Sequence, residues 1–392
     1  MKIEKIKNNN EIKLSEFDLN QLEEIIKFEN HGNYYSKGRT CYYKLKKPIC
    51  FRNTMYSYLK IKGCGIIEEN GIFVRPGTKS FSRVDPHFGI NKDGVAELVY
   101  SDVAPYGGIT LSRAINEYNN FKLLCDNGVS SLIPICVYRY GDLFFDDKQM
   151  GVSISLCENN KPLRMDKLLY KEELIPGEYK KFYEEIYFLE FNKNTELNFK
   201  DKCTLINRIS YKYGMEIRKF CDSGLYIHSG GWSNIQYSID RKNVVLIDLD
   251  SSKKINSSIM IPLLNCRDLI SNIYRLFINL YNPNCISNFD EDVIKSYNFT
   301  FSILNGFFNN IELEKIDYAS KENNNYFINN CFNKIKQIED IMLSIPDGEV
   351  KKYELNILEF YDFCMKLIYP LIIDEYKVKS NNYKLYKSYE RG

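Results

Sequence analysis

The sequence is poor in the residues on which most metal and redox sites depend. It holds three histidines and one tryptophan among 392 residues, and its twelve cysteines form no CxxC pair. Structural zinc sites combine cysteine and histidine at short, regular spacings, so this chain is not expected to carry one. We expect the scattered cysteines to act as small buried apolar residues.

The sequence also lacks an excess of either charge and a long apolar run. Its 53 basic and 51 acidic residues nearly balance, which gives no electrostatic reason to expect a nucleic acid partner. The longest apolar stretch, around residues 363–373, contains Lys366 and Pro370 and is too short for membrane insertion. Because residues 1–13 also lack the apolar core of a signal peptide, we expect a cytoplasmic protein without membrane association.

The length and the order of local patterns predict two lobes of different class. A chain of 392 residues is too long for one small core. Residues 1–157 form a β-patterned lobe with one central helix, and this lobe includes an N-terminal helical extension over residues 15–28. Residues 158–200 form a polar connection, and residues 201–392 form a helical lobe interrupted by one β-hairpin. We therefore predict an α+β, bilobal fold.

The stretch that points most clearly to chemistry is GLYIHSGGWSNIQYSIDRKNVVLIDLDS, residues 224–251. Asn234 precedes the first strand of the predicted hairpin, and Asp248 follows four apolar residues at the buried end of the second. A buried carboxylate requires a metal or a cation as partner. Amide and carboxylate oxygens suit Mg²⁺ bound to a nucleotide phosphate. Asp250 lies two residues further on the same face if the strand persists, as a second ligand or a solvated acid.

Two further segments carry charged residues in a suggestive context. In the strand YSYLKIKGCG, Lys60 and Lys62 share one face, and Gly63 and Gly65 permit close approach of backbone or ligand. We expect Lys60 at the surface. Lys62 is either a second surface lysine or, if a carboxylate holds its ammonium, a contact for phosphates. Glu117 lies on the predicted helix LSRAINEYNNFKLLCDNG, where it either orients Lys62 or is an ordinary solvated acid.

A strand lysine, a helix glutamate, and then an asparagine and an aspartate around a hairpin together resemble the protein-kinase-like fold. Three segments are most similar to the selenoprotein O family, whose members transfer AMP to proteins. Residues 58–65, YLKIKGCG, resemble its strand motif, and residues 108–118, GITLSRAINEY, resemble the start of its helix. Residues 224–234, GLYIHSGGWSN, resemble its metal-binding loop. The likeness covers about residues 56–250.

The resemblance implies a role for each matching residue. Lys62 would bind phosphates, Glu117 would orient Lys62, and Asn234 and Asp248 would hold the metal. Arg164, in KPLRMDKLL, would be a further phosphate contact. The cofactors would be ATP and Mg²⁺. The reaction would be transfer of a phosphoryl or an AMP group to a hydroxyl, on a protein or a small molecule.

The loop departs from both family patterns where a catalytic base is expected. Kinases of this fold place an aspartate two residues after the histidine, where this chain has Gly230, and selenoprotein O places one before the asparagine, where this chain has Ser233. We expect His228 to be structural. A general base contributes about 10²–10⁴-fold to a rate. Two alternatives therefore remain open: an impaired pseudokinase acting as a binding module or scaffold, and a peptide- or small-molecule-tailoring enzyme on the same fold.

Overall fold

The computed structural model describes residues 1–29, 35–37, 39–68, 70–81, 86–90, 96–100, 104–158, 163–170, 173, 175–227, 230–255, 258–278, 291–332 and 351–377. The chain divides into two compact units that alternate along the sequence. Unit 1 comprises Met1–Pro86, Tyr100–Leu163 and Val245–Ser252, and unit 2 comprises His87–Val99, Arg164–Val244 and Lys253–Gly392. The predicted bounds placed Val245–Ser252 in the C-terminal lobe, whereas it groups with the N-terminal residues.

Unit 1 is built on one antiparallel sheet. Its elements are β1 (Ile3–Asn8), α1 (Glu16–Ile26), β2 (Tyr35–Lys37), β3 (Thr40–Phe51), β4 (Thr54–Lys62), β5 (Ile66–Ile67), β6 (Phe73–Val74), β7 (Ser80–Phe81), β10 (Ala104–Pro105), β11 (Ile109–Thr110), α2 (Leu111–Asp126), β12 (Ile133–Phe145) and β13 (Lys148–Cys157). The strand order is β1-β12-β13-β4-β3-β2, and β11 also pairs with β13. This order makes β4 a central strand, between β13 and β3.

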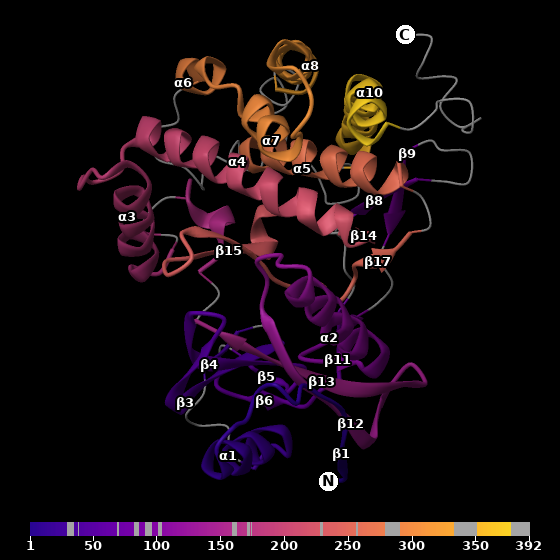
Figure 1. Ribbon diagram of the computed structural model, residues 1–392. Coiled ribbons are helices and arrows are strands. Elements are labelled where there is room, and N and C mark those ends of the chain that lie inside the picture. Colours follow the sequence, from indigo (N-terminus) through magenta and orange to yellow (C-terminus); the bar gives the residue numbers. More distant parts are fainter. Residues whose placement is uncertain are drawn as a thin grey trace. The chain divides into compact units, whose positions relative to one another are not determined.

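A helix covers each face of this sheet (Figure 1). Leu22 and Ile26 of α1 join Leu59 and Ile61 of β4 in the larger apolar core. Ala114 of α2 belongs to a smaller cluster on the sheet. Because side chains alternate along a strand, the residues of β4 next to Leu59 and Ile61 point away from the larger core. Those residues are Lys60 and Lys62.

Both predicted helices of the N-terminal half are confirmed, and local residues explain where each of them begins or ends. Ser15 caps α1 by accepting from the backbone N–H of Asp18. The Asp18 carboxylate also accepts from Tyr43 Oη at 2.8 Å, which ties α1 to β3. Helix α2 ends at Asp126, and Gly128 follows with φ +70°, the left-handed conformation that glycine favours after a helix.

Unit 2 is mainly helical. Its helices are α3 (Glu178–Phe191), α4 (Phe199–Asp222), α5 (Met260–Ile278), α6 (Glu291–Ser296), α7 (Phe299–Phe307), α8 (Leu313–Tyr326) and α10 (Lys351–Tyr376), with short turns η1 (Met165–Lys167), η3 (Trp232–Asn234) and η5 (Phe327–Phe332). The short strands that lie wholly or partly in it are β8 (Pro86–Ile90), β9 (Ala96–Tyr100), β14 (Leu225–Tyr226), β15 (Ile235–Ser238), β16 (Asn243–Leu246) and β17 (Lys253–Lys254). The strands pair as β8-β9, β14-β17 and β15-β16, so the predicted hairpin around Asp240 is present. The chain thus has the predicted α+β class.

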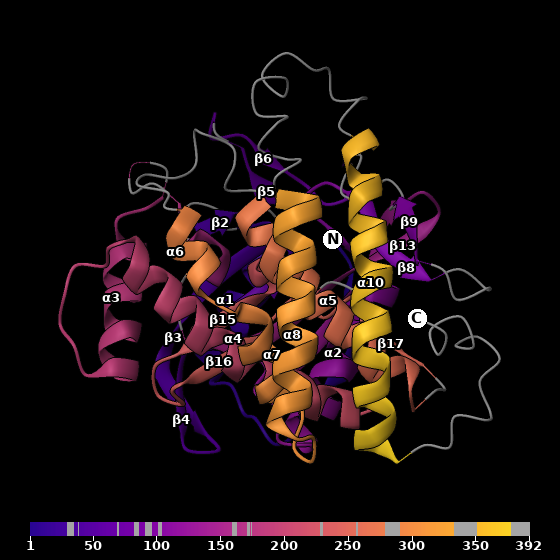
Figure 2. The same ribbon diagram turned by 90° about the horizontal axis from the view of Figure 1, so that it is seen from above.

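Close packing of α4 against α7 depends on two glycines. A Cβ on Gly214 would lie 2.3 Å from the carbonyl oxygen of Ile303, and one on Gly306 would lie 2.0 Å from that of Tyr211. The two backbones therefore meet directly at this crossing. Helices α8 and α10 run side by side nearby (Figure 2).

The helices after residue 290 differ in part from the prediction. The apolar periodicity of residues 291–308 predicts one helix there, but residues 297–298 divide it into α6 and α7. Helix α8 was not predicted, because its sequence LEKIDYASKENNNY is polar and rich in weak helix formers. It forms because Ile316 and Ala319 are buried on one face. The sequence pattern also predicts a helix over roughly residues 324–343, and the part of that range after residue 332 lies outside the described residues.

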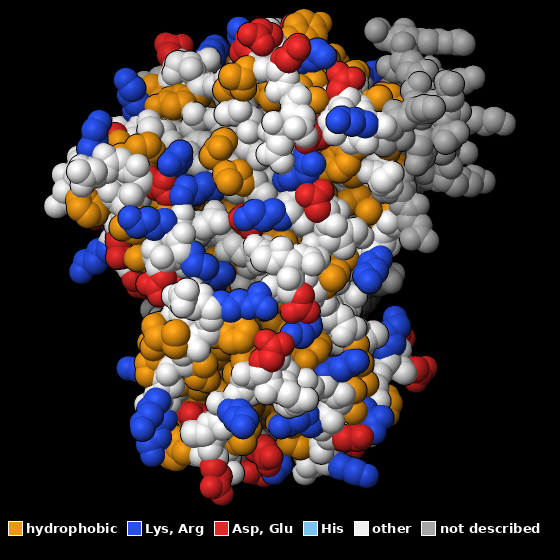
Figure 3. Space-filling view, viewed as in Figure 1, with side chains coloured by type: hydrophobic (Ala, Val, Ile, Leu, Met, Phe, Trp, Pro, Cys, Tyr) orange, Lys and Arg blue, Asp and Glu red, His pale blue; other side chains and the backbone are white. Residues whose placement is uncertain are grey.

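On the face shown in Figure 3, basic and acidic side chains are interspersed, and neither sign of charge dominates. This agrees with the near balance of 53 basic and 51 acidic residues. Among the described helices, none has the length and apolarity needed to cross a membrane.

A buried ion pair between Glu375 and Arg218 stabilises unit 2. Glu375 of α10 accepts from Arg218 Nη1 of α4 at 2.5 Å and from the backbone N–H of Asn310 at 2.9 Å. Glu375→Gln is expected to lower the free energy of unfolding by about 3 kcal/mol, because it removes the buried counter-charge of a largely buried guanidinium and leaves Arg218 paired with the half-exposed Asp222. The matched control is Asp374→Asn. Asp374 forms a half-exposed pair with Lys315, so a change within about 1 kcal/mol is expected. Equal effects of the two variants in urea denaturation would contradict this account.

The same pair predicts a pH dependence. Burial alone would raise the pKa of Glu375, but hydrogen bonds from Arg218 and the loop amides outweigh it and hold the pKa below its usual 4.5. A depressed carboxylate pKa contributes stability that is present above pH 4.5 and lost as the pH falls through the folded-state pKa. The difference in the free energy of unfolding between wild type and Glu375→Gln should therefore shrink as the pH falls below 4.5.

Candidate functional site

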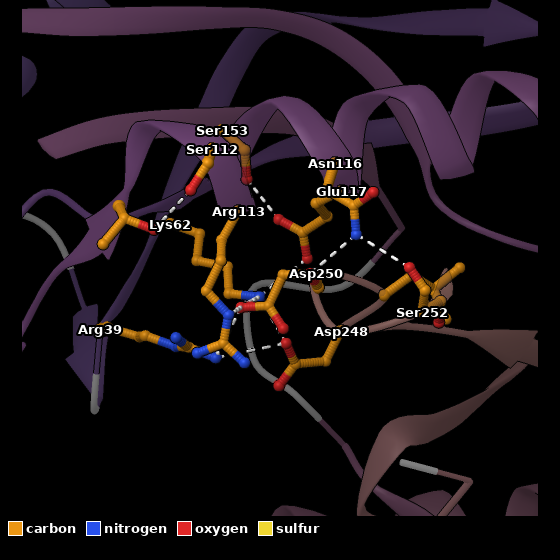
Figure 4. A network of polar contacts seen from close by, with 12 residues as sticks. Arg39, Lys62, Ser112, Arg113, Asn116, Glu117, Ser153, Asp248, Asp250 and Ser252 are labelled. Carbon is orange, nitrogen blue, oxygen red and sulfur yellow. Dashed lines mark hydrogen bonds and ion pairs between the residues drawn. The ribbon is translucent and has the colours of Figure 1, made fainter. Parts of the chain in front are cut away.

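Lys62 ends strand β4 and lies buried against a carboxylate of helix α2. Its Nζ is 2.9 Å from Glu117 Oε1, and each of the two side chains is only 2% exposed. Ser153 of β13, which faces Lys62 in the sheet, donates from Oγ to the other oxygen of Glu117. The structure thus brings together the lysine and the glutamate that the sequence singled out (Figure 4).

Two carboxylates from the segment after β16 complete the cluster around Lys62. Lys62 Nζ donates to Asp248 Oδ1 and lies 3.2 Å from Asp250 Oδ2. Asp250 is the more deeply buried of the two, with its side chain 3% exposed against 21% for Asp248. The solvated alternative for Asp250 is therefore wrong. The acid expected at the buried strand end, Asp248, is partly exposed.

The two acids reach Lys62 through a turn, not along one face of a strand. Strand β16 ends at Leu246, and Asp248 has φ +60°, in the left-handed region that aspartate tolerates better than most residues. The expectation that the strand persists to Asp250 is wrong. The turn is what allows two side chains separated by one residue to converge on the same ammonium group.

Helix α2 and the loop before β12 hold this turn in unit 1. Asn116 Nδ2 donates to the carbonyl oxygens of Asp250 and Ser252, each at 2.9 Å. Asn120, one helical turn further on, donates to the carbonyl oxygen of Leu249 at 2.9 Å. The backbone N–H of Leu246 donates to Ser130 O. The i, i+4 spacing of the two asparagines is visible in the sequence and could have identified this face of the helix.

Arg39 adds a cation that no sequence motif indicated. Its backbone oxygen accepts from the N–H of Gly63 at 2.7 Å, so it lies beside the end of β4. Its Nη2 is 3.1 Å from Asp250 Oδ2 and 3.5 Å from Asp248 Oδ1. Arg113 of α2 lies further from Asp250, with its Nε at 3.9 Å from Oδ2. The cluster therefore contains three cations and three carboxylates, the latter including Glu117.

Gly63 permits the close packing beside Lys62. It has φ +101°, and a Cβ there would lie 2.5 Å from Ile109 Cγ2 and 2.6 Å from the carbonyl oxygen of Gly151. We expected the glycines to let a backbone or a ligand come close. At Gly63 it is the neighbouring strands β11 and β13 that come close. Any side chain at this position would displace the end of β4 and with it the Lys62 ammonium.

Lys62 and Asp250 keep their charges near neutral pH. Burial alone would lower the pKa of Lys62, but the attraction of Asp248, Asp250 and Glu117 outweighs it and raises the pKa above 10.5. Burial alone would raise the pKa of Asp250, but Lys62 and Arg39 hold it below 3.8. Both groups are therefore ionised over the range between those values.

Lys60 does not lie at the surface, as the sequence led us to expect. It is 6% exposed, on the same side of β4 as Lys62. The expectation failed because β4 lies in the middle of the sheet, between β13 and β3, and the strand order cannot be read from an alternating pattern.

The other predicted metal ligand, Asn234, belongs to unit 2. It closes the turn η3, where its N–H donates to the carbonyl oxygen of Gly231 at 2.8 Å. Trp232 in the same turn is buried. Its ring therefore belongs to the apolar core.

The loop that leads to Asn234 is anchored on two helices of unit 2. Asn265 of α5 accepts from the N–H of Ile227 at 2.9 Å, and Asp268 accepts from Tyr226 Oη at 2.7 Å. Tyr213 of α4 donates to the carbonyl oxygen of Gly230 at 2.9 Å. His228, between these anchors, lies outside the described residues.

Arg164, the predicted phosphate contact, also belongs to unit 2. It forms an isolated antiparallel bridge with Gln236 of β15, two residues after Asn234. Its carbonyl oxygen accepts from Tyr183 Oη at 2.7 Å. The structure thus brings Arg164 close to the segment of Asn234 within unit 2, and Lys62, Glu117 and Asp248 together within unit 1.

The donor set of unit 1 fits a metal shared with a phosphate better than a metal held by protein alone. In the part of the chain that the structure describes, no group of three or more His, Cys, Asp or Glu side chains is arranged to hold a metal. Mg²⁺ often takes only one or two carboxylates and receives its other ligands from phosphates and water. Asp248 and Asp250 meet that requirement, and Asp250 Oδ2 is buried with ion pairs but without a hydrogen bond to any described residue.

Comparison with known proteins gives distant likenesses only. No family model and no curated protein matches the sequence. One similar solved structure is WaaP in complex with acyl carrier protein, at 9% identity and a TM-score of 0.35, over 87% of this chain and 98% of that one. Another is a Rio2 kinase complex with ADP, Mg²⁺ and phosphoaspartate from Chaetomium thermophilum, at 14% identity and a TM-score of 0.25, over 92% and 81%.

Proposed function

We propose that this protein is a kinase-like transferase that binds ATP with Mg²⁺ and moves a phosphoryl or an AMP group to a hydroxyl on a protein or a small molecule. The observation that carries the proposal is the buried Lys62–Glu117 pair with Asp248 at the same lysine nitrogen. A strand lysine held by a helix carboxylate, next to an aspartate that can take Mg²⁺, is the arrangement by which kinase-like folds bind nucleotide phosphates.

Each residue has a distinct part in this proposal. The Lys62 ammonium neutralises phosphate charge, and Glu117, fixed by Ser153, keeps the ammonium in place. Asp248 and Asp250 supply oxygens for the metal, which would neutralise charge that develops on the phosphates during transfer. Asn234 as a metal ligand and Arg164 as a phosphate contact rest on the resemblance to the selenoprotein O family alone. The proposal that AMP is the transferred group also rests on that resemblance alone.

The alternative of a pseudokinase is favoured by one feature of the sequence. No carboxylate occurs between His228 and Asn234, so the loop lacks the base that both related patterns contain. Charge stabilisation and positioning dominate phosphoryl-type transfer, which makes activity without this base compatible with the proposal. In the pseudokinase the same cluster would bind nucleotide without transfer.

Nucleotide binding is the first test. We expect ATP with Mg²⁺ at about 100 times its dissociation constant to add about 2.7 kcal/mol to the stability of the fold, seen as a rise of several degrees in the melting temperature. ATP with EDTA should give a smaller rise. No shift with any nucleoside triphosphate would overturn the proposal.

Labelled ATP then separates the activities. Transfer of label from γ-labelled ATP to protein indicates phosphorylation, and transfer from α-labelled ATP indicates adenylylation. Binding without either label would favour the pseudokinase.

A further inference from the structure

We infer that Arg39 is a phosphate-binding residue: a guanidinium that pairs with Asp248 and Asp250 in this structure and contacts the β- and γ-phosphates of a nucleotide when those carboxylates take Mg²⁺. The inference rests on the proposed function and extends it to a residue outside the motifs that suggested that function. It is carried by the position of Arg39, by its contacts and by the charge balance of the cluster.

The backbone of Arg39 is fixed beside the phosphate-binding lysine. Its carbonyl oxygen accepts from the N–H of Gly63, and the next residue, Thr40, is paired with Lys62 in the sheet. The guanidinium therefore starts from the residue just before β3, the strand that pairs with the Lys62 strand, and reaches the same two acids. Its side chain is 14% exposed, so one part of it remains open to a ligand.

The contacts of Arg39 leave donors available. Within the described residues, both of its ion pairs use Nη2, which leaves Nε and Nη1 for a further acceptor. A guanidinium has five N–H donors in a planar fork, and this geometry suits two oxygens of a phosphate. Arg39 can therefore bind a phosphate with a minor change of side-chain conformation.

The charge balance identifies Arg39 as the cation that changes partner. Lys62 has Glu117 as a counter-charge in addition to the two aspartates. The ion pairs of Arg39 among the described residues are with Asp248 and Asp250 alone. A divalent cation on these carboxylates repels the guanidinium, whereas the triphosphate attracts it. Arg39 should therefore exchange its carboxylates for phosphate, while Lys62 keeps Glu117.

The test measures binding of ATP, ADP and AMP by calorimetry in Mg²⁺, for wild type, Arg39→Gln and Arg39→Lys. Arg39→Gln is expected to weaken ATP binding by about 10- to 100-fold, the effect of losing a charge-assisted hydrogen bond. AMP affinity is expected to stay within about twofold, because AMP lacks the phosphates concerned. Arg39→Lys keeps the positive charge and loses the planar fork of N–H donors. Its ATP affinity should therefore lie between those of wild type and Arg39→Gln.

The matched control is Arg139→Gln, which removes an exposed arginine of unit 1 paired with Glu4 and should leave all three affinities unchanged. Unchanged ATP affinity in Arg39→Gln would overturn the inference. A parallel loss for ATP, ADP and AMP would also overturn it, because that result indicates a structural role. If Arg39→Gln does not fold, Arg39→Lys replaces it in the test. A ratio of ATP affinity to AMP affinity below that of wild type supports the inference, and an unchanged ratio overturns it. If wild type binds no nucleotide, the proposed function itself fails, and this outcome is distinct from the other two.

Discussion

Replacing Lys62 by methionine is expected to lower the free energy of unfolding by about 3–5 kcal/mol, because one cation of a buried cluster disappears while its three carboxylates remain. Glu117 would keep only the hydroxyl of Ser153, among the contacts described here. Asp248 and Asp250 would keep Arg39. Denaturation in urea at pH 7 measures the change.

The same substitution is expected to reduce nucleotide-dependent transfer by at least about 10³-fold, because a fixed charge at the phosphates acts most strongly on the transition state. The matched control is Lys122→Met. Lys122 lies on the same helix as Glu117, is 31% exposed, and pairs with Glu11 and Asp126 at the surface. It should change stability by less than about 1 kcal/mol and leave transfer unaltered.

A double-mutant cycle separates the ion pair from the general effect of losing a buried lysine. In Lys62→Met/Glu117→Gln the unpaired carboxylate is also removed, so the double variant should be more stable than the sum of the single effects by about 1–3 kcal/mol. Additive effects would show that the two side chains do not stabilise each other, and would contradict the 2.9 Å pair on which the proposal depends.

Replacing Asp248 by asparagine is expected to remove the dependence of ATP binding on Mg²⁺. The variant keeps the size of the side chain and loses the charge that a divalent cation requires, so affinity for ATP with Mg²⁺ should fall by about 100-fold, or about 2.7 kcal/mol. Affinity for ATP in EDTA should change little or rise, because one negative charge near the phosphates has been removed. Calorimetry with and without Mg²⁺ measures both.

The control for this substitution is Asp146→Asn, an exposed aspartate of unit 1 that pairs only loosely with Lys148. It should leave the effect of Mg²⁺ on ATP binding intact. If Asp248→Asn binds ATP as wild type does in both conditions, Asp248 is not a metal ligand. Asp250, which is buried beside it, would then be the residue to test.

The sequence predicted the parts of this cluster that depend on local pattern. Lys62 follows an alternating strand and precedes glycines, Glu117 lies on a helix with a clear apolar stripe, and Asp248 ends an apolar run. Each of these signals involves neighbours in the chain. The α+β class followed from the same local patterns, because the strands are concentrated in the first half of the chain.

The parts that the sequence did not predict depend on distant segments. Arg39 reaches Asp250 across about 200 positions, and nothing near it in the sequence indicates that contact. Lys60 was misplaced because the strand order, which makes β4 central, is a property of the whole sheet. The turn at Asp248 could not be read from an apolar run that predicted a longer strand.

The central claim is that the Lys62 cluster binds the phosphates of a nucleotide together with Mg²⁺. The most direct test is a crystal structure of the protein with a non-hydrolysable ATP analogue and Mg²⁺. We predict a metal ion about 2.1 Å from an oxygen of Asp248 and phosphate oxygens within about 3 Å of Lys62. The orientation of the nucleotide would also distinguish phosphoryl from AMP transfer. An analogue bound away from these residues, with Lys62 still paired to Asp248, would contradict the claim.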